Sequence, residues 1–538
     1  MQIQQVPTQP IANQKMGTSG LRRKVSEVMN TPHFLENFIQ AILNAASAKG
    51  KTFVVGGDGR YLNKQAIQII LKMAIANRVG HLIVGQDGLF STPAVSCVIR
   101  KYKTDGGFIL SASHNPGGPD GDFGLKFDVE NGGPCPEQVS ARIYEQTQSL
   151  TSYQIADMPD IDIHTLQTQT FGDTKITVIN PIDDYVELMK SLFDFSQIRD
   201  LLASGFRMVY DAMNAVTGPY ALRIFEQELG APKGTVLHAV PLEDFGGLHP
   251  DPNLTYARSL VDIMNSDKAP DFGAASDGDG DRNMILGPNF FVNPSDSLAI
   301  LLSYAAQRNP EGVVGVARSM PTSLAVDRVA KQLGLPVYET PTGWKFFGHL
   351  LDAGKITLCG EESFGTGSCH IREKDGLWAV LFWLSILAQT RLSVQEVVED
   401  MWHKYGRSYQ MRYDFDGVDK QVADQMIQSL REKMPTLAGQ DIGRWHIEKA
   451  DDFSYTDPVT GEVTPHQGLR VVLRGGRLLC RLSGTGTQGA TVRVYVEGFE
   501  AENIHQQPAQ ELAPYMALAL SVFEVEKWTG RTQPSVIT

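Results

Sequence analysis

A serine beside a histidine, in a glycine-rich loop, is the first candidate for chemistry in this sequence. Ser113 and His114 lie in SASHNPGG (111–118), directly after the apolar run GGFIL (106–110). The glycines and Pro119 exclude a long helix there, so we expect the serine hydroxyl in a loop at the end of a buried strand. In that place Ser113 is either a nucleophile or a turn residue.

A second candidate is an acidic loop whose carboxylates alternate with glycines. Asp277, Asp279 and Asp281 lie in SDGDGDR after the apolar run FGAA. Two carboxylates about 4 Å apart repel by about 1 kcal/mol in water and about 4 kcal/mol in a protein-like dielectric. A divalent cation removes that repulsion, and all-oxygen ligands favour Mg²⁺ or Ca²⁺ over zinc. An EF-hand is excluded because Arg282 and Pro288 stand where it needs Gly and Glu. An exposed acidic turn is the remaining alternative.

A glycine-rich loop near the C-terminus is a candidate anion site. GTGTQG (484–489) matches G-x-G-x-x-G, but the following TVRVYVEG reads as a strand, whereas a dinucleotide-binding fingerprint must open a helix. Ser483 and Thr485 offer hydroxyls, and Arg481 and Arg493 lie near the ends of the loop. Hydroxyls, backbone N–H groups and arginines together bind anions. A plain hairpin loop is the alternative.

Further loops carry carboxylates, hydroxyls and cationic groups that could bind a ligand. GEESFG (360–365) places Glu361 and Ser363 on one turn, where they can form hydrogen bonds with the hydroxyl groups of a ligand. The alternative is that this turn is the N-terminus of a helix with a capping residue. Cationic and hydroxyl groups occur in GTSGLRRK, PTGWKFF and IREKDG, namely Arg22, Arg23, Lys24, Thr342, Lys345, Arg372 and Lys374. Singly these are typical solvated groups, but together they predict a cationic cleft.

The candidates favour phosphoryl transfer over acyl transfer. Acyl transfer needs a base, an orienting acid and an oxyanion hole, and no G-x-S-x-G surrounds Ser113. A metal loop with phosphate-binding loops suits phosphoryl transfer, where catalysis is mainly positioning and charge stabilisation. The sequence has no Walker A motif or kinase signature, so we expect the serine itself to carry the phosphoryl group.

Composition limits the protein class. The 538 residues carry a net charge of −13 without a basic tract, so we expect no nucleic-acid partner. The five cysteines are widely spaced without CxxC, which indicates reduced thiols in a cytoplasmic protein. The first ten residues lack the pattern of a secretory signal. The longest apolar run (377–387) is too short to span a bilayer, so it predicts a core helix and no membrane partner.

Apolar strands and amphipathic helices alternate through most of the chain. We expect an α/β fold of three related domains with mixed, largely parallel sheets. From about residue 403 the pattern changes and predicts an α+β domain. The serine loop, the acidic loop and GEES each follow a predicted strand, where open α/β sheets bind their ligands.

The motifs GTSGLR, SASHNPGG, DGDGDR, GEESFG, HIREKDG and RLSGTGTQGA, in this order, resemble those of the α-D-phosphohexomutase family. Ser111 stands where that family usually has Thr, and Cys369 stands where Asp is common in the branch that acts on glucose phosphates. The resemblance covers nearly the whole chain. It implies four domains around a central cleft: 1–184 with the phosphoserine loop, 185–292 with the metal loop, 293–402 with the sugar loop, and a TATA-box-binding-protein-like domain, 403–538, with the phosphate loop.

The resemblance also implies a role for each candidate residue. Ser113 would be the phosphoserine, flanked by Arg22 and His114, and its phosphate would bind Mg²⁺ with Asp277, Asp279 and Asp281. Lys126 and Lys374 would transfer protons or contact phosphate. The remaining contacts would be Arg282 and Thr342 to the bisphosphate, Glu361 and Ser363 to sugar O3 and O4, and Ser483, Thr485 and Arg493 to the distal phosphate.

The implied reaction interconverts glucose 1-phosphate and glucose 6-phosphate through glucose 1,6-bisphosphate. The expected partner is thus a phosphosugar, and the expected assembly is a monomer or weak homodimer. The alternatives are a mutase that prefers mannose phosphates or accepts both sugars, a phosphatase that uses a phosphoserine, and a non-catalytic relative. GEESFG favours glucose, and the intact serine and acidic loops favour catalysis.

Overall fold

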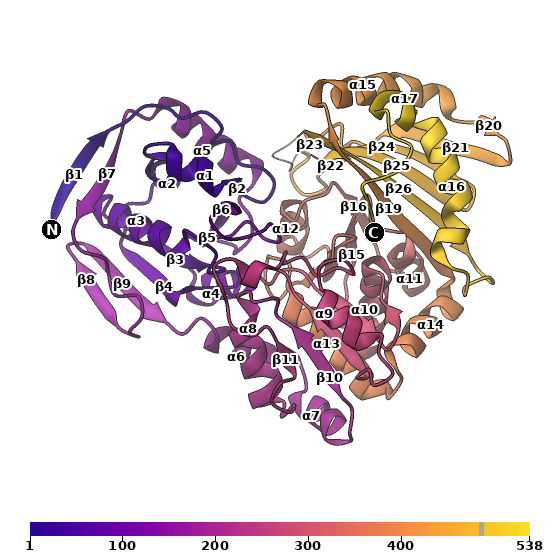
Figure 1. Cartoon of the computed structure of the whole chain (residues 1–538), viewed down its shortest axis with the longest axis horizontal. Helices are drawn as coiled ribbons and strands as arrows, with labels where there is room; N and C mark the ends of the chain where they lie inside the picture. The colour runs from indigo at the N-terminus through magenta and orange to yellow at the C-terminus, as the bar shows by residue number, and fades with distance from the viewer. Residues whose placement is uncertain (484–488) are drawn as a thin grey trace. The chain divides into compact units, whose positions relative to one another are not determined.

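The computed structural model describes residues 1–483 and 489–538, which form two compact units (Figure 1). The first unit comprises Met1–Val292, Gly343–Leu351 and Ser363–Gln395. The second comprises Asn293–Thr342, Asp352–Glu362 and Glu396–Thr538.

A seven-stranded mixed sheet forms the N-terminal part of the first unit. Its order is β2 (Leu21–Lys24), β6 (Asp122–Val129), β5 (Gly106–Leu110), β3 (Thr52–Gly57), β4 (His81–Leu89), β9 (Thr174–Ile179) and β8 (Thr168–Phe171). Strands β5, β3, β4 and β9 run parallel, whereas β6 is antiparallel to both β5 and β2. The helices of this part are α1 (Val25–Asn30), α2 (Phe34–Ala45), α3 (Asn63–Ala76), α4 (Thr92–Tyr102) and α5 (Glu137–Ser149), with an outlying ribbon of β1 (Gln2–Pro7) and β7 (Ser152–Asp157).

The sequence of this sheet explains its burial. All five residues of β5 are buried, and both α3 and α4 contact β3. Central parallel strands covered on both faces are continuous apolar runs, as β5 is. Ser91 caps the N-terminus of α4: its side chain accepts a hydrogen bond from the backbone N–H of Ala94, and Pro93 lies in the first turn of the helix.

A second mixed sheet in the first unit carries the acidic loop. Its order is β11 (Val236–Leu237), β10 (Met208–Asp211), β12 (Phe272–Ala275), β13 (Met284–Gly287) and β14 (Phe290–Phe291), with β10 parallel to β11 and β12. The accompanying elements are α6 (Asp183–Leu192), α7 (Phe195–Ala203), α8 (Thr217–Ala221), η1 (Leu222–Glu228), α9 (Arg258–Met264), β18 (Gly365–Ser368) and α13 (Gly376–Thr390).

The apolar run 377–387 forms α13, and every residue from Gly376 to Ala388 is buried. The prediction of a core helix is therefore confirmed. Within the described part of the chain, no single helix is long and apolar enough to cross a membrane, and only α13 joined to α14 (Val394–Tyr405) as a bent pair has the length and composition.

The second unit contains a parallel sheet of order β16 (Val337–Thr340), β15 (Val316–Ser319) and β17 (Leu358–Glu361), with α10 (Pro294–Arg308) and α11 (Ala325–Leu333). Two local predictions were wrong. Glu361 ends β17 instead of lying on one turn with Ser363, and the alternative of a helix start in 360–365 fails too, because β18 follows. In the first unit, Lys345 is the first residue of α12 (Lys345–Asp352) and not part of a glycine turn.

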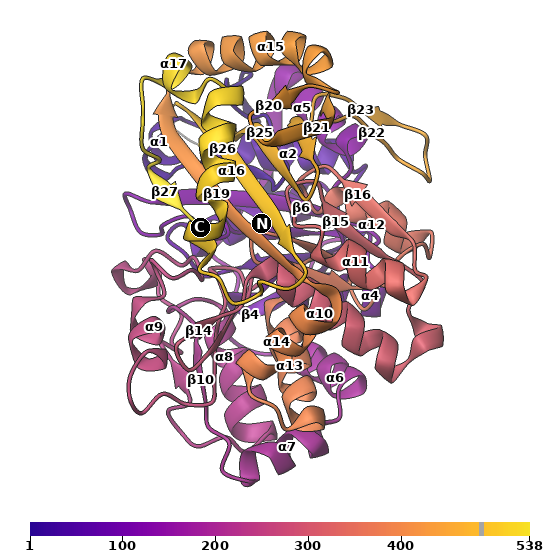
Figure 2. The ribbon, with the colours of Figure 1, turned by 90° about the vertical axis from the view of Figure 1, so that its right-hand side faces the viewer.

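The C-terminal part of the second unit is an antiparallel sheet, which confirms the predicted α+β domain. Its order is β20 (Asp441–Ile442), β21 (Trp445–Asp452), β24 (Leu469–Leu473), β25 (Gly476–Ser483), β26 (Ala490–Glu500), β19 (Arg407–Val418) and β27 (Val536–Ile537). Figure 2 shows α16 (Pro508–Val522) along β26 and β19, and α15 (Lys420–Leu437) and α17 (Val525–Thr529) share one apolar core with the sheet. The expected strand after GTGTQG is β26, antiparallel to β25.

Candidate active site

Ser113 lies in the turn after β5, and its hydroxyl reaches the acidic loop. Ser113 Oγ donates a hydrogen bond to Asp277 Oδ2 at 2.8 Å, across 164 residues of chain. His114 Nδ1 is 3.5 Å from Ser113 Oγ. The structure therefore brings together the serine and the carboxylates that sequence analysis singled out separately.

The two serines of the loop have different surroundings. Ser111 Oγ donates to Asp58 Oδ2 at 2.6 Å and accepts the backbone N–H of Ser113 at 2.7 Å. Ser111 is fully buried, and its hydroxyl is engaged by both partners. Ser113 is therefore the serine whose hydroxyl points to the acidic loop.

Asp277, Asp279 and Asp281 form a group that could hold a metal ion. Their carboxylate oxygens lie within 4.8 Å of one another, and all three residues are buried. Asp279 Oδ1 and Asp281 Oδ1 accept no hydrogen bond from the described residues. Buried carboxylate oxygens without donors are suited to coordinate a hard cation such as Mg²⁺ or Ca²⁺.

Glycine is required within the acidic loop because the serine loop approaches it closely. A Cβ at Gly278 would lie 2.3 Å from the backbone oxygen of Ser113. Gly280 has φ +80°, in the left-handed region that side chains disfavour. The alternation DGDGD therefore lets two backbones meet and still presents three carboxylates.

The electrostatics of the three carboxylates differ. Burial raises the pKa of Asp277 well above its usual range, and repulsion by Asp281 and Asp279 adds to the rise. Burial acts in the same direction on Asp279, but Lys126 outweighs it and the pKa of Asp279 is lowered. The Lys126 ammonium thus already supplies one of the positive charges this loop needs.

Four cationic side chains surround these carboxylates. Lys126 Nζ, on β6, is 2.6 Å from Asp279 Oδ2 and 3.6 Å from Asp281 Oδ2. Lys374 Nζ is 3.2 Å from Asp281 Oδ2. Arg282 Nε is 4.0 Å from Asp277 Oδ2. Together with the half-buried Arg22, these cations suit the binding of a phosphate group.

The imidazole of His114 is held neutral at pH 7. Burial lowers its pKa well below the usual value, and Arg282 and Arg22 lower it further. Burial also lowers the pKa of Arg22, while Asp279 acts in the opposite direction. His114 is therefore suited to hydrogen bonding at the serine and not to contributing a positive charge.

The other predicted residues are divided between the two units of the chain. Thr342, Glu361, Ser483 and Arg493 belong to the second unit, whereas Ser363 begins the last segment of the first. Thr342 Oγ1 accepts a hydrogen bond from Arg481 Nη1 at 2.6 Å, and Arg493 Nε is 3.5 Å from Asp414 Oδ2. Glu361 and Ser483 are buried, and Thr485 lies outside the described residues.

Sequence reasoning missed several charged residues that support the site. Asp58 and Arg60 directly follow β3, and both are fully or almost fully buried. Asp251 Oδ1 accepts a hydrogen bond from Arg282 Nη1 at 3.2 Å. Charged residues directly after an apolar strand, in VVGGDGR, are the signal that could have identified Asp58 and Arg60.

A buried pair of acids is a further missed feature. Asp128, on β6, and Glu373, beside Lys374, are both buried. Burial raises the pKa of Asp128 to about 7 and that of Glu373 well above its usual range, with mutual repulsion adding to the latter. One of the two acids is therefore protonated near neutral pH.

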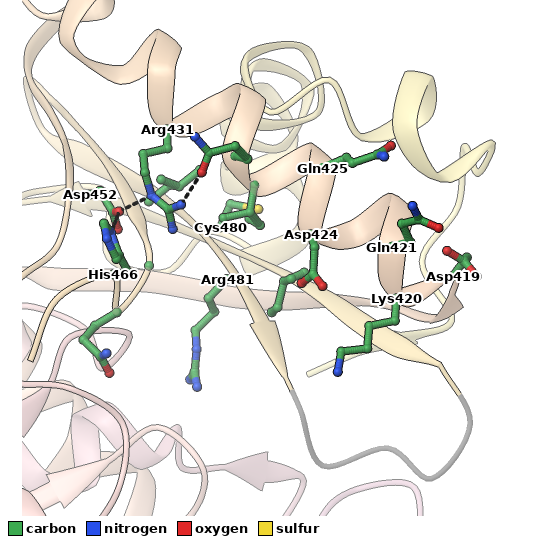
Figure 3. A pocket seen from close by; sticks show the side chains of 16 residues that line it. Asp419, Lys420, Gln421, Asp424, Gln425, Arg431, Asp452, His466, Cys480 and Arg481 are labelled. Atoms are coloured by element: carbon green, nitrogen blue, oxygen red, sulfur yellow. Dashed lines mark hydrogen bonds and ion pairs between the residues drawn. The ribbon is translucent and has the colours of Figure 1, made fainter.

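A groove of about 1020 Å³ lies in the C-terminal part of the second unit (Figure 3). Side chains of α15, β25 and the segment before β24 line it, among them Lys420, Asp424 and Arg481. On one side Asp452 accepts hydrogen bonds from Arg431 at 2.5 Å and pairs with His466 at 2.5 Å. Arg481, from the glycine-rich loop motif, is thus a described candidate residue that lines this groove.

Comparison with known proteins supports one family for the whole chain. Residues 13–154, 183–289 and 293–405 match phosphoglucomutase/phosphomannomutase α/β/α domains I, II and III, and residues 407–535 match the phosphoglucomutase-1 C-terminal domain. These matches confirm the predicted fold class.

Similar proteins cover the chain from end to end. A phosphoglucomutase of Rhizobium radiobacter is 52% identical over all of both chains, and phosphoglucomutase-1 of Oryctolagus cuniculus is 48% identical over all of both. The crystal structure of pp63/parafusin (phosphoglucomutase) from Paramecium has a TM-score of 0.92 and 46% identity, over 100% of this chain and 99% of that one. The chain therefore belongs to the phosphoglucomutase/phosphomannomutase family.

Proposed function

We propose that this protein is an enzyme that interconverts glucose 1-phosphate and glucose 6-phosphate, with Ser113 as phosphoryl carrier and glucose 1,6-bisphosphate as intermediate and activator. The observation that carries the proposal is the 2.8 Å contact between Ser113 Oγ and Asp277, one of three buried carboxylates with four cationic side chains near them. The relatives named phosphoglucomutase, at 48–53% identity, support glucose phosphates as substrates.

The reaction needs two balanced transfers. In the first, the bond between phosphorus and Ser113 Oγ breaks, O6 of glucose 1-phosphate forms the new bond to phosphorus, O6 loses its proton to a base, and Ser113 Oγ takes up a proton. The glucose 1,6-bisphosphate then turns over. In the second, the bond between phosphorus and O1 breaks, Ser113 Oγ forms the new bond and loses its proton, and O1 takes up a proton as glucose 6-phosphate leaves. Such transfers depend mainly on positioning and on stabilising negative charge.

The first unit contains the groups for the transfer itself. Asp277, Asp279 and Asp281 would hold Mg²⁺ together with the phosphate on Ser113. When bound, the ion supplies positive charge to the phosphoryl oxygens. Arg22 and neutral His114 would hydrogen-bond the phosphoserine, and Lys126 and Lys374 would transfer protons or contact phosphate.

The remaining residues would bind the sugar phosphate. Arg282, Lys374 and Thr342 would contact the bisphosphate, and Glu361 and Ser363 would bind sugar O3 and O4. Ser483, Thr485 and Arg493 would hold the phosphate that is not being transferred. Hydroxyls and arginine suit a site that must accept a phosphate from two orientations of the sugar.

The proposal includes the wider organisation. We assign the phosphoserine loop, metal loop, sugar loop and phosphate loop to domains 1–184, 185–292, 293–402 and 403–538. We place the protein in the cytoplasm, as a monomer or weak homodimer that binds a phosphosugar and has no nucleic-acid or membrane partner. One relative is named as cytoplasmic and another as chloroplastic, so the location of this protein has to be tested directly.

A coupled assay tests the function. Glucose 6-phosphate formation from glucose 1-phosphate, with Mg²⁺ and a trace of glucose 1,6-bisphosphate, should be fast and should disappear with EDTA and in Ser113→Ala. Ser191→Ala, at an exposed position of α6, is the matched control and should retain full activity.

A parallel assay with mannose 1-phosphate decides between the alternatives. Preference for mannose would replace the glucose assignment, and comparable rates would indicate a dual-specificity enzyme. Release of inorganic phosphate as the main product would indicate a phosphatase. No turnover by folded protein with phosphorylated Ser113 would refute the proposal.

A further inference from the structure

The backbone of Ser113 has a conformation that needs support. Its φ is +52°, in the left-handed region where residues other than glycine, asparagine and aspartate are uncommon. This conformation directs the side chain to Asp277, on a loop from another sheet. Something must hold it, because an unsupported serine would favour other backbone conformations.

Two hydrogen bonds hold the two polar backbone groups of Ser113. Its N–H donates to Ser111 Oγ at 2.7 Å, and its carbonyl oxygen accepts from Arg60 Nη2 at 2.8 Å. Both supporting side chains meet at one carboxylate. Ser111 Oγ donates to Asp58 Oδ2 at 2.6 Å, and Arg60 Nε donates to the same oxygen at 2.9 Å.

This ring of groups is well anchored in the sheet. Asp58 and Ser111 have no exposed surface, and Arg60 is 1% exposed. Arg60 Nη1 also donates to the backbone oxygen of Asp122 at 2.9 Å, and Asn63 donates to Asp58 Oδ1 at 3.1 Å. Buried hydrogen-bonded pairs of this kind are rigid, so a group attached to them has a defined position.

We propose that Ser111 is a positioning residue, whose hydroxyl links the buried Asp58–Arg60 ion pair to the backbone N–H of Ser113 and thereby aims Ser113 Oγ at the acidic loop. The inference rests on the proposed function for its kinetic consequences, because Ser111 itself carries no phosphoryl group. Its role requires a hydroxyl that accepts one hydrogen bond and donates another, so threonine is equivalent and alanine is not.

The test compares Ser111→Ala with Ser111→Thr, which keeps the hydroxyl, and with Ser111→Cys, a weaker donor and acceptor. Single-turnover transfer from phospho-Ser113 to glucose 1-phosphate is measured by rapid quench and divided by the phosphoserine content found by mass spectrometry. We expect a fall of about tenfold to a hundredfold in Ser111→Ala, a smaller fall in Ser111→Cys, and a rate within threefold of wild type in Ser111→Thr. KM should change less than twofold.

A merely structural role gives a different pattern. It would lower the melting temperature and the fraction of phosphorylated protein, but leave the transfer rate per phosphoserine unchanged. A normalised rate in Ser111→Ala within twofold of wild type therefore overturns the proposal. If Ser111→Ala does not fold, the Ser111→Cys comparison decides in the same way.

A second readout is independent of activity. Amide hydrogen exchange of the peptide around residues 111–115 should be faster in Ser111→Ala than in wild type and Ser111→Thr, because the Ser113 N–H loses its acceptor. Inactive wild-type protein would refute the proposed function, and the exchange comparison alone would then decide the positioning role. Equal exchange in Ser111→Ala and wild type would overturn it.

Discussion

Lys126→Met should destabilise the protein far more than the same substitution at Lys72. Both ammonium groups lie 2.6 Å from a carboxylate, Lys126 from Asp279 and Lys72 from Asp160. The difference is burial: the side chains of Lys126 and Asp279 are 8% and 0% exposed, whereas those of Lys72 and Asp160 are 18% and 74% exposed. Distance and chemistry are thus matched, and only the surroundings of the pair differ.

The magnitudes follow from that difference. Removing one partner of a buried pair leaves an uncompensated charge and costs about 3–5 kcal/mol. Lys126 is also 3.6 Å from Asp281, so without it both Asp279 and Asp281 lose a positive charge that offsets the repulsion between the carboxylates of the acidic loop. An ion pair with one exposed partner contributes about 0–1 kcal/mol, which is the expected effect of Lys72→Met.

Urea unfolding with chelator and with Mg²⁺ measures both effects. With chelator, we expect a loss of about 3–5 kcal/mol in Lys126→Met. Mg²⁺ should raise the free energy of unfolding of Lys126→Met more than that of wild type, because the variant's carboxylates lack a cation and bind the ion more tightly. Equal losses in the two variants, or a smaller Mg²⁺ effect in Lys126→Met, would refute this account of the acidic loop.

Three further predictions concern other parts of the structure. Burial raises the pKa of Asp128 above its value in the unfolded chain, so the native state binds more protons there and this group reduces stability as pH rises from about 4 to 7. Asp128→Asn should therefore gain stability relative to wild type over that pH range, measured by urea titrations at several pH values. A difference between the two proteins that does not change with pH would contradict the raised pKa. Arg493→Ala should raise KM for both phosphosugars about tenfold or more, whereas Arg474→Ala, with its side chain 84% exposed, should leave KM unchanged; equal KM values would remove Arg493 from the phosphate site. Leu384→Ala, fully buried in α13, should lower the free energy of unfolding by about 2–5 kcal/mol, and a loss below about 1 kcal/mol would show that α13 is not part of a packed core.

Local patterns predicted the elements that carry the site. The buried run GGFIL forms β5 and FGAA forms β12, since each is short, apolar and followed by glycine-rich loops. The α13 helix was predictable for the same reason, as an apolar run too short for a membrane. The end of β17 was less predictable, because a strand can extend into a glycine when its neighbour supplies a partner, as Arg318 of β15 does for Gly360.

The supporting charges were harder to find. Asp58, Arg60 and Asp251 act through side chains distant in sequence, as in the contact between Arg60 and the backbone oxygen of Ser113, 53 residues away. The position of Asp58 and Arg60 after an apolar strand marks them as candidates, but it does not show what they contact, because a buried arginine and an exposed one look alike in a sequence. Only packing decides which charged residues are enclosed and must therefore be paired.

The sequence by itself determined the types and order of the reacting groups: a serine loop, a glycine-spaced acidic loop and hydroxyl-rich and cationic loops, with the fold class and the phosphohexomutase resemblance. The tertiary structure alone decided which of the two loop serines faces the carboxylates. Ser111 and Ser113 have the same side chain, and their roles differ because one hydroxyl is enclosed between Asp58 and a backbone N–H while the other meets Asp277. The physical reason is that the hydrogen-bond partners are set by the meeting of the loops that follow β3, β5 and β12, which are far apart along the chain.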